Sequence, residues 1–310
     1  MAEKMATRDA YGKTLIELGG KYDNLVVMDA DLSGSTRTGK FKAVYPERFL
    51  NMGISEADLM AEATGMAFSG KIVCASTFAM FAAGRAYEII RNSIGYTKAN
   101  VKICATHGGI TVGADGASHQ TFEDLGLMRL IPNMTVLCPS DGISAAKLLE
   151  QAVAMEGPCY IRFGRAPVPF FYDENADIRM GKGNLVRDGK DISIIATGIM
   201  VEKAALAAEK LADKGIDARV IDIHTLKPLD EEIVIKAARE TGAVVTAEEH
   251  SIIGGLGDAV ASVLGRKQPC PIAMVGQQDV FGESGQPDEL LKKYGMTEDD
   301  IAAAAEGILK

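Results

Sequence analysis

Short apolar runs alternate with amphipathic stretches along most of this chain, and this alternation limits the possible folds more than any other feature. The apolar runs have the length and β-branched content of buried strands, and the stretches between them have helical spacing. Strands are expected at residues 25–28, 71–75, 101–105, 135–138 and 159–163, and helices at 8–18, 55–68, 79–94 and 142–155. The first half of the sequence therefore predicts an α/β fold with a mostly parallel sheet covered on both faces.

A proline- and aromatic-rich stretch interrupts the alternation at residues 165–175. Beyond it, strands are expected at 192–196, 218–223, 243–246 and 272–275. A helix is expected after Thr197-Gly198, with an apolar stripe formed by Val201, Ala204, Ala205, Ala208, Leu211 and Ala212. We therefore expect two α/β domains, at residues 1–167 and 181–310, joined by an ordered linker at 168–180.

Charge and composition exclude several classes of partner. The formal net charge is −9 and no basic run offsets it, so neither nucleic acid nor an anionic membrane is an expected partner. The N-terminus lacks the apolar core of a signal peptide, and no apolar run approaches the length of a membrane span, so the expected location is the cytoplasm. The five cysteines form no CxxC pair, which predicts reduced core residues rather than a zinc site or a disulfide framework.

Two of the four histidines, His107 and His119, lie in one glycine-rich stretch at residues 104–124. The apolar run before His107 is typical of a buried strand, so His107 is expected at the strand's carboxyl end, where open α/β sheets bind ligands. Asp115 and His119 follow on the same loop. Two imidazoles and a carboxylate can handle protons and hydroxyl groups. The alternative is a surface loop whose histidines are incidental.

A second group of candidate residues lies upstream. Ser55 has the residue type of an N-cap, and Glu56 and Asp58 fall in the first turn of the helix that it would open. Phe78 and Phe81 are three residues apart at the start of the next expected helix, so they share one face. Taken alone, the acidic residues are explained by the helix dipole and the phenylalanine pair by core packing. An aromatic wall for a flat ligand is the functional alternative.

Order and spacing change this interpretation, because the motifs resemble those of transketolase over essentially all 310 residues. The resemblance covers the C-terminal half of the full-length family enzyme and implies a pyrimidine-binding domain followed by a smaller C-terminal transketolase domain. Glu56 in Gly-Ile-Ser-Glu resembles the glutamate that contacts the aminopyrimidine of thiamine diphosphate. Phe78 and Phe81 resemble the rings that pack on it, and Asp31 and Leu32 match a segment near the cofactor.

The same resemblance implies a sugar-phosphate site in this chain. The residues that match its substrate ligands are Arg8, Ser35, His107, Asp115, His119 and Arg165. Arginine is suited to phosphate, so Arg8 and Arg165 would bind the phosphate together with Ser35. The two histidines and Asp115 would bind the sugar.

The implied activity is the transfer of a two-carbon glycolyl unit from a ketose phosphate to an aldose phosphate. Thiamine diphosphate would supply the carbanion chemistry, and the chain would supply orientation and proton control. The implied catalytic residues are Glu56, His107 and His119. Glu56 would share a proton with the pyrimidine ring, and the histidines would bind hydroxyl groups and relay protons.

Three positions depart from the family pattern. Ala57 stands where the family has a histidine after the glutamate, and Gly84 stands where an aromatic residue usually follows the phenylalanine pair. Gly108 replaces an aspartate that family members often carry. We therefore expect a cofactor pocket that is looser or is completed by another side chain.

The chain lacks a Gly-Asp-Gly motif, which in thiamine enzymes belongs to the ligands of the metal that binds the diphosphate; the nearest string is Gly257-Asp258-Ala259. No metal ligand is therefore assigned to this chain, because Mg²⁺ or Ca²⁺ needs a set of hard oxygen ligands. The resemblance implies a split transketolase. A separate N-terminal subunit would hold the diphosphate and the metal, and two copies of each subunit would form an α2β2 heterotetramer.

Three alternatives stay open at this point. Deoxyxylulose phosphate synthase has a similar loop but carries Asp-Arg where this chain has Thr106-His107. The β subunit of a 2-oxo acid dehydrogenase is also split, but its loop lacks the Ala-Asp-Gly-Ala-Ser-His pattern. A non-catalytic α/β interaction subunit with a degenerate pocket is the third. The sequence does not distinguish the preferred sugar phosphates.

Overall fold

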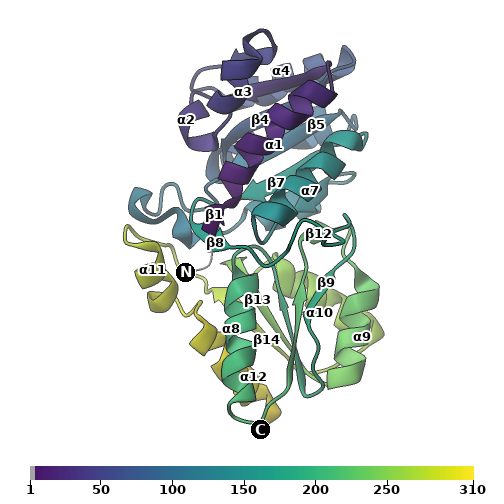
Figure 1. Cartoon of the computed structure of the whole chain (residues 1–310), viewed down its shortest axis with the longest axis vertical. Coiled ribbons are helices and arrows are strands. Elements are labelled where there is room, and N and C mark those ends of the chain that lie inside the picture. The colour runs from purple at the N-terminus through teal and green to yellow at the C-terminus, as the bar shows by residue number, and fades with distance from the viewer. Residues whose placement is uncertain (1–3) are drawn as a thin grey trace.

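The computed structural model describes residues 4–310, and in this range two sheets follow one another along the long axis of the molecule (Figure 1). The first sheet has seven strands and the second has five within the same range. A two-stranded ribbon, β1 (Lys4–Ala6) with β8 (Pro167–Pro169), lies at the junction. Helices flank both sheets, so the predicted α/β fold class is confirmed.

The strands of the first sheet that come from the N-terminal half are mutually parallel. In spatial order they are β6 (Thr135–Leu137), β7 (Cys159–Phe163), β5 (Val101–Thr106), β4 (Ile72–Phe78), β2 (Leu25–Asp29) and β3 (Phe49–Asn51). All but β3 lie where the sequence predicts a strand. β4 runs past its expected end, and Phe78 pairs with Thr106 of β5. The residues around Phe78 and His107 therefore meet at the carboxyl edge of the sheet.

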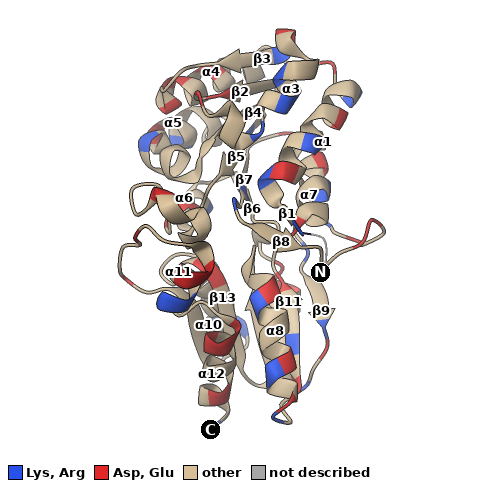
Figure 2. Cartoon of the chain, turned by 60° about the vertical axis from the view of Figure 1, so that its left-hand side comes forward, with Lys and Arg blue, Asp and Glu red and all other residues tan. Residues whose placement is uncertain are grey.

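Helices cover the two faces of this sheet in separate groups (Figures 1 and 2). The helices on one face are α1 (Thr7–Lys21), α3 (Gly39–Val44) and α7 (Gly142–Ala154), and those on the other are α4 (Glu56–Phe68) and α6 (Asp124–Leu130). The first group buries Tyr11, Phe41 and Leu148 against the strands, and the second buries Leu59 and Met128. Each such side chain contributes about 1.5–3 kcal/mol by leaving water.

The prediction of a single helix at residues 79–94 is wrong. Two π-helical turns, η2 (Phe81–Arg85) and η3 (Ile90–Gly95), flank the short α5 (Tyr87–Ile89). A π-turn is wider than an α-turn, and such turns are frequent at functional sites. The first one begins at Phe81 and therefore helps to set where this ring lies relative to Phe78.

The second sheet is parallel except at one edge. Its order is β14 (Ile272–Gln277), β13 (Val244–Ser251), β10 (Ile192–Ala196), β11 (Ala218–Asp222) and β9 (Asn184–Arg187), with β9 antiparallel to β11. Its covering helices are α8 (Met200–Ala212) and α12 (Glu298–Leu309) on one face, and α9 (Glu231–Thr241) and α10 (Leu256–Lys267) on the other. The expected stripe of α8 is right in part: Ala207 is buried although it was not included, and Ala212 is exposed.

Strand β12 (Thr225–Lys227) joins the two halves of the chain in a way that the sequence did not indicate. It belongs to the C-terminal half but pairs antiparallel with β6 at the edge of the first sheet. Leu226 of this strand is buried in a core that also contains Met128 of α6 and Leu256 of α10. The apolar core on this side is therefore continuous between the two halves.

Asp141 holds the linker against α7. Its Oδ1 accepts from the amide of Ser144 at 2.7 Å and caps the helix, and its Oδ2 accepts from the amides of Phe171 and Tyr172. One side chain therefore satisfies a helix end and fixes the start of the linker. The remaining short helices are α2 (Ser33–Thr36), η1 (Pro46–Arg48), η4 (Ile110–Asp115) and α11 (Pro287–Lys293).

The cysteines follow the expected pattern with one exception. All five cysteines are free thiols, and all are buried apart from Cys270, which is half-buried. Acidic and basic residues are interspersed over both halves of the molecule (Figure 2). Between residues 4 and 310, no helix combines the length and the apolar character needed to cross a membrane.

Candidate active site

The carboxyl edge of the first sheet carries a cluster of rings. Phe78 and Phe81 lie nearly parallel, with ring centroids 6.0 Å apart. His107 stacks on Phe78 at 4.0 Å, and His119 meets Phe81 edge-on at 5.4 Å. The structure thus brings together the rings that the sequence analysis selected. Because Phe81 and His119 remain partly exposed, the cluster is a wall at the surface rather than an enclosed core.

The hydrogen bonds of His107 define its tautomer. The residue has a φ of 59°, and Arg8 Nη1 lies 2.9 Å from its Nε2. A guanidinium can only donate, so Nε2 accepts and the proton lies on Nδ1, which is 2.8 Å from the hydroxyl of Thr106. Burial, followed by the charges of Arg8 and Arg165, lowers the pKa of His107 to about 3. His107 is therefore neutral at physiological pH.

Guanidinium groups gather beside this histidine. Arg8 Nη1 also donates to the carbonyl of Ser35 at 3.1 Å, and Arg165 lies 3.5 Å from the carboxylate of Asp115. Burial, followed by the charge of Arg37, lowers the pKa of Arg8, and Arg165 adds to this effect. The sequence analysis missed Arg37, although it lies two positions after Ser35. The charges of Arg8, Arg37 and Arg165 all act on His107, and such a group of cations is suited to an anionic ligand.

Asp31 and Leu32 lie at the end of β2, in a loop held by its own hydrogen bonds. Asp31 has a φ of 62°, and Asn51 accepts from its amide and donates to its carboxylate, each at 3.0 Å. The amide of Leu32 donates to buried Asp29 at 2.6 Å. Asp31 is exposed and Leu32 is half-buried. The structure places both residues at the carboxyl edge of the first sheet without hydrogen-bonding them to the ring cluster.

Glu56 is buried at the first residue of α4, with 1% of its surface exposed. Its Oε2 accepts from Arg85 Nη1 at 2.7 Å, and the guanidinium carbon of Arg85 lies 5.3 Å from the centroid of the Phe81 ring. The sequence analysis missed Arg85, whose spacing of four residues from Phe81 was the available signal. The expected side-chain cap is wrong, because the hydroxyl of Ser55 donates to the carbonyl of Met52.

The structure accounts for two departures from the family pattern. At Gly84, an added Cβ would lie 3.0 Å from the terminal methyl carbon of Met80, so a larger side chain there requires Met80 to shift. At Gly108, an added Cβ would lie 2.0 Å from Nε of Arg162. An aspartate at position 108 is therefore incompatible with the observed position of Arg162.

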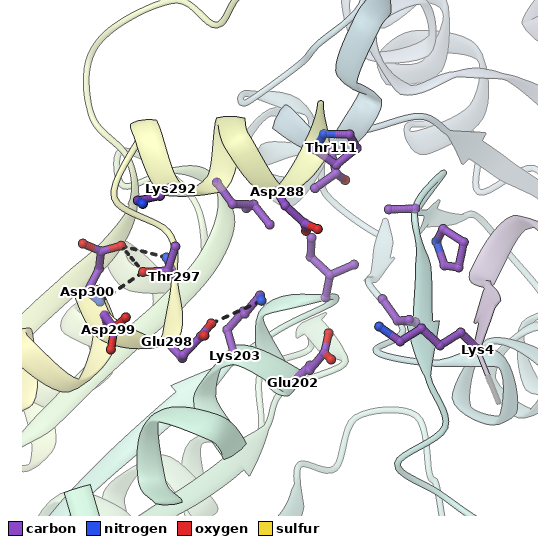
Figure 3. A pocket seen from close by; sticks show the side chains of 16 residues that line it. Lys4, Thr111, Glu202, Lys203, Asp288, Lys292, Thr297, Glu298, Asp299 and Asp300 are labelled. Carbon is purple, nitrogen blue, oxygen red and sulfur yellow. Dashed lines mark hydrogen bonds and ion pairs between the residues drawn. The ribbon is translucent and has the colours of Figure 1, made fainter. Parts of the chain in front are cut away.

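A cavity of about 620 Å³ lies between the two halves of the molecule (Figure 3), and no residue of the ring cluster lines it. Thr111 lines it from the loop that carries Asp115, and Lys203 pairs with Glu298 across its floor at 3.2 Å. The charged lining residues are Lys4, Glu202, Lys203, Asp288, Lys292, Glu298, Asp299 and Asp300. Carboxylates outnumber amines here, which makes the cavity a poor site for an anionic ligand.

Fold and site together define a two-domain α/β protein with a candidate binding site at the edge of its first sheet. Two α/β units are joined in one chain, and the parallel strands of the first present stacked rings, a buried carboxylate and guanidinium groups at one edge. Over residues 4–310, no three His, Cys, Asp or Glu side chains cluster closely enough to hold a metal ion.

Comparisons with known proteins place this class in a family. The family model for the transketolase pyrimidine-binding domain matches residues 3–169, and the model for the transketolase C-terminal domain matches residues 181–301. The chain belongs to the transketolase family, as its motifs predicted.

Two relatives and one solved structure span nearly the same length as this chain. The chain is 51% identical to a Methanocaldococcus jannaschii protein whose name assigns it provisionally to a transketolase C-terminal section, over 95% of this chain and 93% of that one. It is 43% identical to a 6-deoxy-6-sulfo-D-fructose transketolase subunit of Clostridium sp., over 96% and 92%. A solved split-gene transketolase, described as an inactive β4 tetramer, matches with a TM-score of 0.93, 54% identity and 98% coverage of both chains.

Proposed function

We propose that this chain is the C-terminal subunit of a split transketolase that transfers a two-carbon glycolyl unit from a ketose phosphate to an aldose phosphate. The observation that carries the proposal is the cluster at the strand edge. There, Phe78 stacks on His107, Phe81 lies parallel to Phe78, and Arg8 reaches both His107 and Ser35. A flat ligand and an anionic ligand would be bound side by side.

The residues fit the aminopyrimidine part of thiamine diphosphate, the cofactor that the family uses. The near-parallel rings of Phe78 and Phe81 suit a flat aromatic group. Buried Glu56 would share a proton with a pyrimidine ring nitrogen through Oε1, because Arg85 occupies Oε2. When bound, the cofactor supplies the carbanion chemistry. The N-terminal subunit would hold the diphosphate through Mg²⁺ or Ca²⁺.

The chain's own side chains would then position the substrate. Arg8, Arg37 and Arg165 would bind the substrate phosphate, with Ser35 beside them. Asp115 would recognise a sugar hydroxyl once the phosphate competes for Arg165.

The two histidines would have different roles because their surroundings differ. His107 is neutral and would bind a hydroxyl through Nε2 when the phosphate draws Arg8 away. His119 is partly exposed, and its Nδ1 lies 3.0 Å from the hydroxyl of Ser118. It would bind a sugar hydroxyl and relay a proton. Asp31 and Leu32 would line the cofactor side of the site.

Exposed apolar side chains support a composite enzyme. Ile54 is 77% exposed two residues before Glu56, and Tyr96 and Leu130 are 83% and 74% exposed. Large apolar side chains at the surface are typical of protein interfaces when they gather in patches. We propose an α2β2 heterotetramer, in which the N-terminal subunit covers the Ile54 side of the site. The solved relative described as an inactive β4 tetramer is consistent with a subunit that needs a partner.

The first experiment compares the chain purified from its native host with the recombinant chain alone. We expect thiamine-dependent transfer from xylulose 5-phosphate to ribose 5-phosphate only in the native complex. Activity in the chain alone would contradict a split enzyme. A parallel assay with a 6-deoxy-6-sulfo-D-fructose donor tests the activity named for the Clostridium relative, and transfer from that donor alone would revise the substrate class.

The second experiment changes the cofactor site in the assembled enzyme. Glu56→Gln and Glu56→Ala should lower turnover on the order of 10²-fold or more, as expected for the loss of an acid–base group. Asp58→Asn is the matched control, because Asp58 is exposed in the same helical turn. Near-normal turnover of Glu56→Gln would contradict the cofactor assignment.

A further inference from the structure

The loop that carries Asp115 and His119 is anchored on the C-terminal domain as well as on its own, where Arg165 donates to the carbonyl of Val112. At its start, the amide of Thr111 donates to Glu249 Oε1 at 2.6 Å. Glu249 lies on β13 of the second sheet and is 6% exposed. The carboxylate of Glu249, in the C-terminal domain, therefore binds the backbone amide of Thr111, four residues before Asp115.

The far end of the loop is held by the same domain. The hydroxyl of Ser284 donates to the carbonyl of Ala114 at 2.6 Å, and Gln120 Nε2 donates to the carbonyl of Glu283 at 2.9 Å. Both contacts come from the segment just before α11. Between them lie Asp115 and His119, so the C-terminal domain contacts the loop on either side of the two sugar-binding candidates.

Buried groups leave Glu249 little freedom to move. Arg162 Nη1 donates to its carbonyl at 2.8 Å, and Arg162 pairs with Asp124 at 3.2 Å. Gly109 has a φ of 83°, and a Cβ there would lie 2.3 Å from the carboxyl carbon of Glu249. Burial raises the pKa of Glu249, and Arg162 and the amide of Thr111 oppose this rise. The close approach at Gly109 is what lets the carboxylate reach the loop.

We propose that Glu249 is a positioning residue of the sugar site, acting through the amide of Thr111. It would fix where Asp115 and His119 lie relative to the ring cluster, and this gives the C-terminal domain a part in substrate binding. The inference rests on the proposed function. Substrate-binding groups displaced by about 1 Å can cost up to 10²-fold in rate, so a single anchor of this kind has a measurable effect.

The kinetic test uses three variants in the assembled enzyme. Glu249→Ala removes the acceptor and should raise the KM of both sugars by about tenfold and lower kcat, without changing the affinity for thiamine diphosphate. Glu249→Gln keeps an oxygen for Thr111 and should recover most of the loss. Glu248→Gln is the matched control, because Glu248 is also buried but accepts from the amides of Leu256 and Gly257.

A KM of Glu249→Ala equal to that of the native enzyme would overturn the proposal. Glu249→Gln as impaired as the alanine variant would also overturn it, because a retained acceptor would then make no difference. A rise in KM for Glu248→Gln of the same size would assign the effect to general loss of packing, which contradicts a specific anchor.

Hydrogen exchange of the full-length chain provides a readout that does not depend on activity. Amides of residues 109–120 should exchange faster in Glu249→Ala than in the native chain, Glu249→Gln or Glu248→Gln. Unchanged exchange in the alanine variant would overturn the anchor even if the enzyme transfers glycolyl units. Faster exchange in a complex without transketolase activity would reject the proposed function while leaving the anchor in place.

Discussion

His107 shows how two neighbours can decide the chemistry of one residue. Arg8 donates to Nε2 and Thr106 lies against Nδ1, so both ring nitrogens are occupied. The folded pKa of about 3 lies below the ordinary value of 6.5. As pH falls below 6.5, the unfolded chain binds a proton that the folded chain refuses until about pH 3. The contribution of His107 to stability is therefore lost across this acidic window.

The prediction at this scale concerns the proton on His107. Between pH 5 and pH 8, the ¹⁵N signals of its ring should stay constant and show a neutral imidazole protonated at Nδ1. His107→Gln assigns the signal. His224, whose pKa burial lowers to about 4, should also stay neutral and serves as an internal reference. A titration of His107 with a midpoint between 6 and 7 would contradict the arrangement with Arg8.

At the scale of elements, Asp222 connects β11 by hydrogen bonds to the residues just before α7 and to the linker. Its Oδ2 accepts from the hydroxyls of Ser140 at 2.7 Å and Tyr172 at 2.9 Å. Burial raises the pKa of Asp222 to about 7, the two hydroxyl groups oppose the rise, and nearby Asp141 adds to it. From about pH 4 to pH 7, the folded chain keeps a proton that the unfolded chain has lost. Stability from this group therefore falls as pH rises through that range.

Asp222→Asn should remove this pH dependence because the amide is always neutral. Relative to the native chain, the variant should gain stability at pH 8, on the order of a few kcal/mol, and gain much less at pH 5. Chemical denaturation at the two pH values measures the difference. Asp177→Asn, an exposed carboxylate in the linker, is the control and should behave like the native chain. A gain equal at both pH values would argue against a protonated Asp222.

At the scale of the whole molecule, the two domains share more than a linker. β12 is built into the sheet of the other domain, and the core around Leu226 continues into both halves. The loop around Asp115 rests on the second sheet through Thr111 and Glu249. Folding of one domain therefore depends on contacts with the other.

The corresponding prediction is a single cooperative unfolding transition. Calorimetry of the chain should give one peak. The van't Hoff enthalpy of unfolding should equal the calorimetric enthalpy per mole of chain. Leu226→Ala should cost about 2–5 kcal/mol by emptying the shared core, whereas Leu185→Ala, at a side chain that is 53% exposed on β9, should change little. Two separated peaks in the native chain would show that β12 does not couple the domains.

Much of the fold can be predicted from the sequence because strands and helices depend on the local pattern of apolar residues. β7 and β10 begin and end at the expected residues, since short apolar β-branched runs between helical stretches signal buried strands. The glycine-rich loop after β5 singled out His107, and the order of motifs along the chain identified the family and selected Phe78 before any contact was known.

Only the tertiary structure decided which distant residues meet. The sequence determined the α/β class, the strands and the family of this protein, because periodicity and motif spacing act along the chain. β12 has three residues and pairs across the domain boundary, so no local signal marks it. The contacts of Glu56 with Arg85 and of Glu249 with Thr111 join residues far apart in the sequence. Such contacts form only when the elements pack closely together. No local sequence pattern predicts which elements these are.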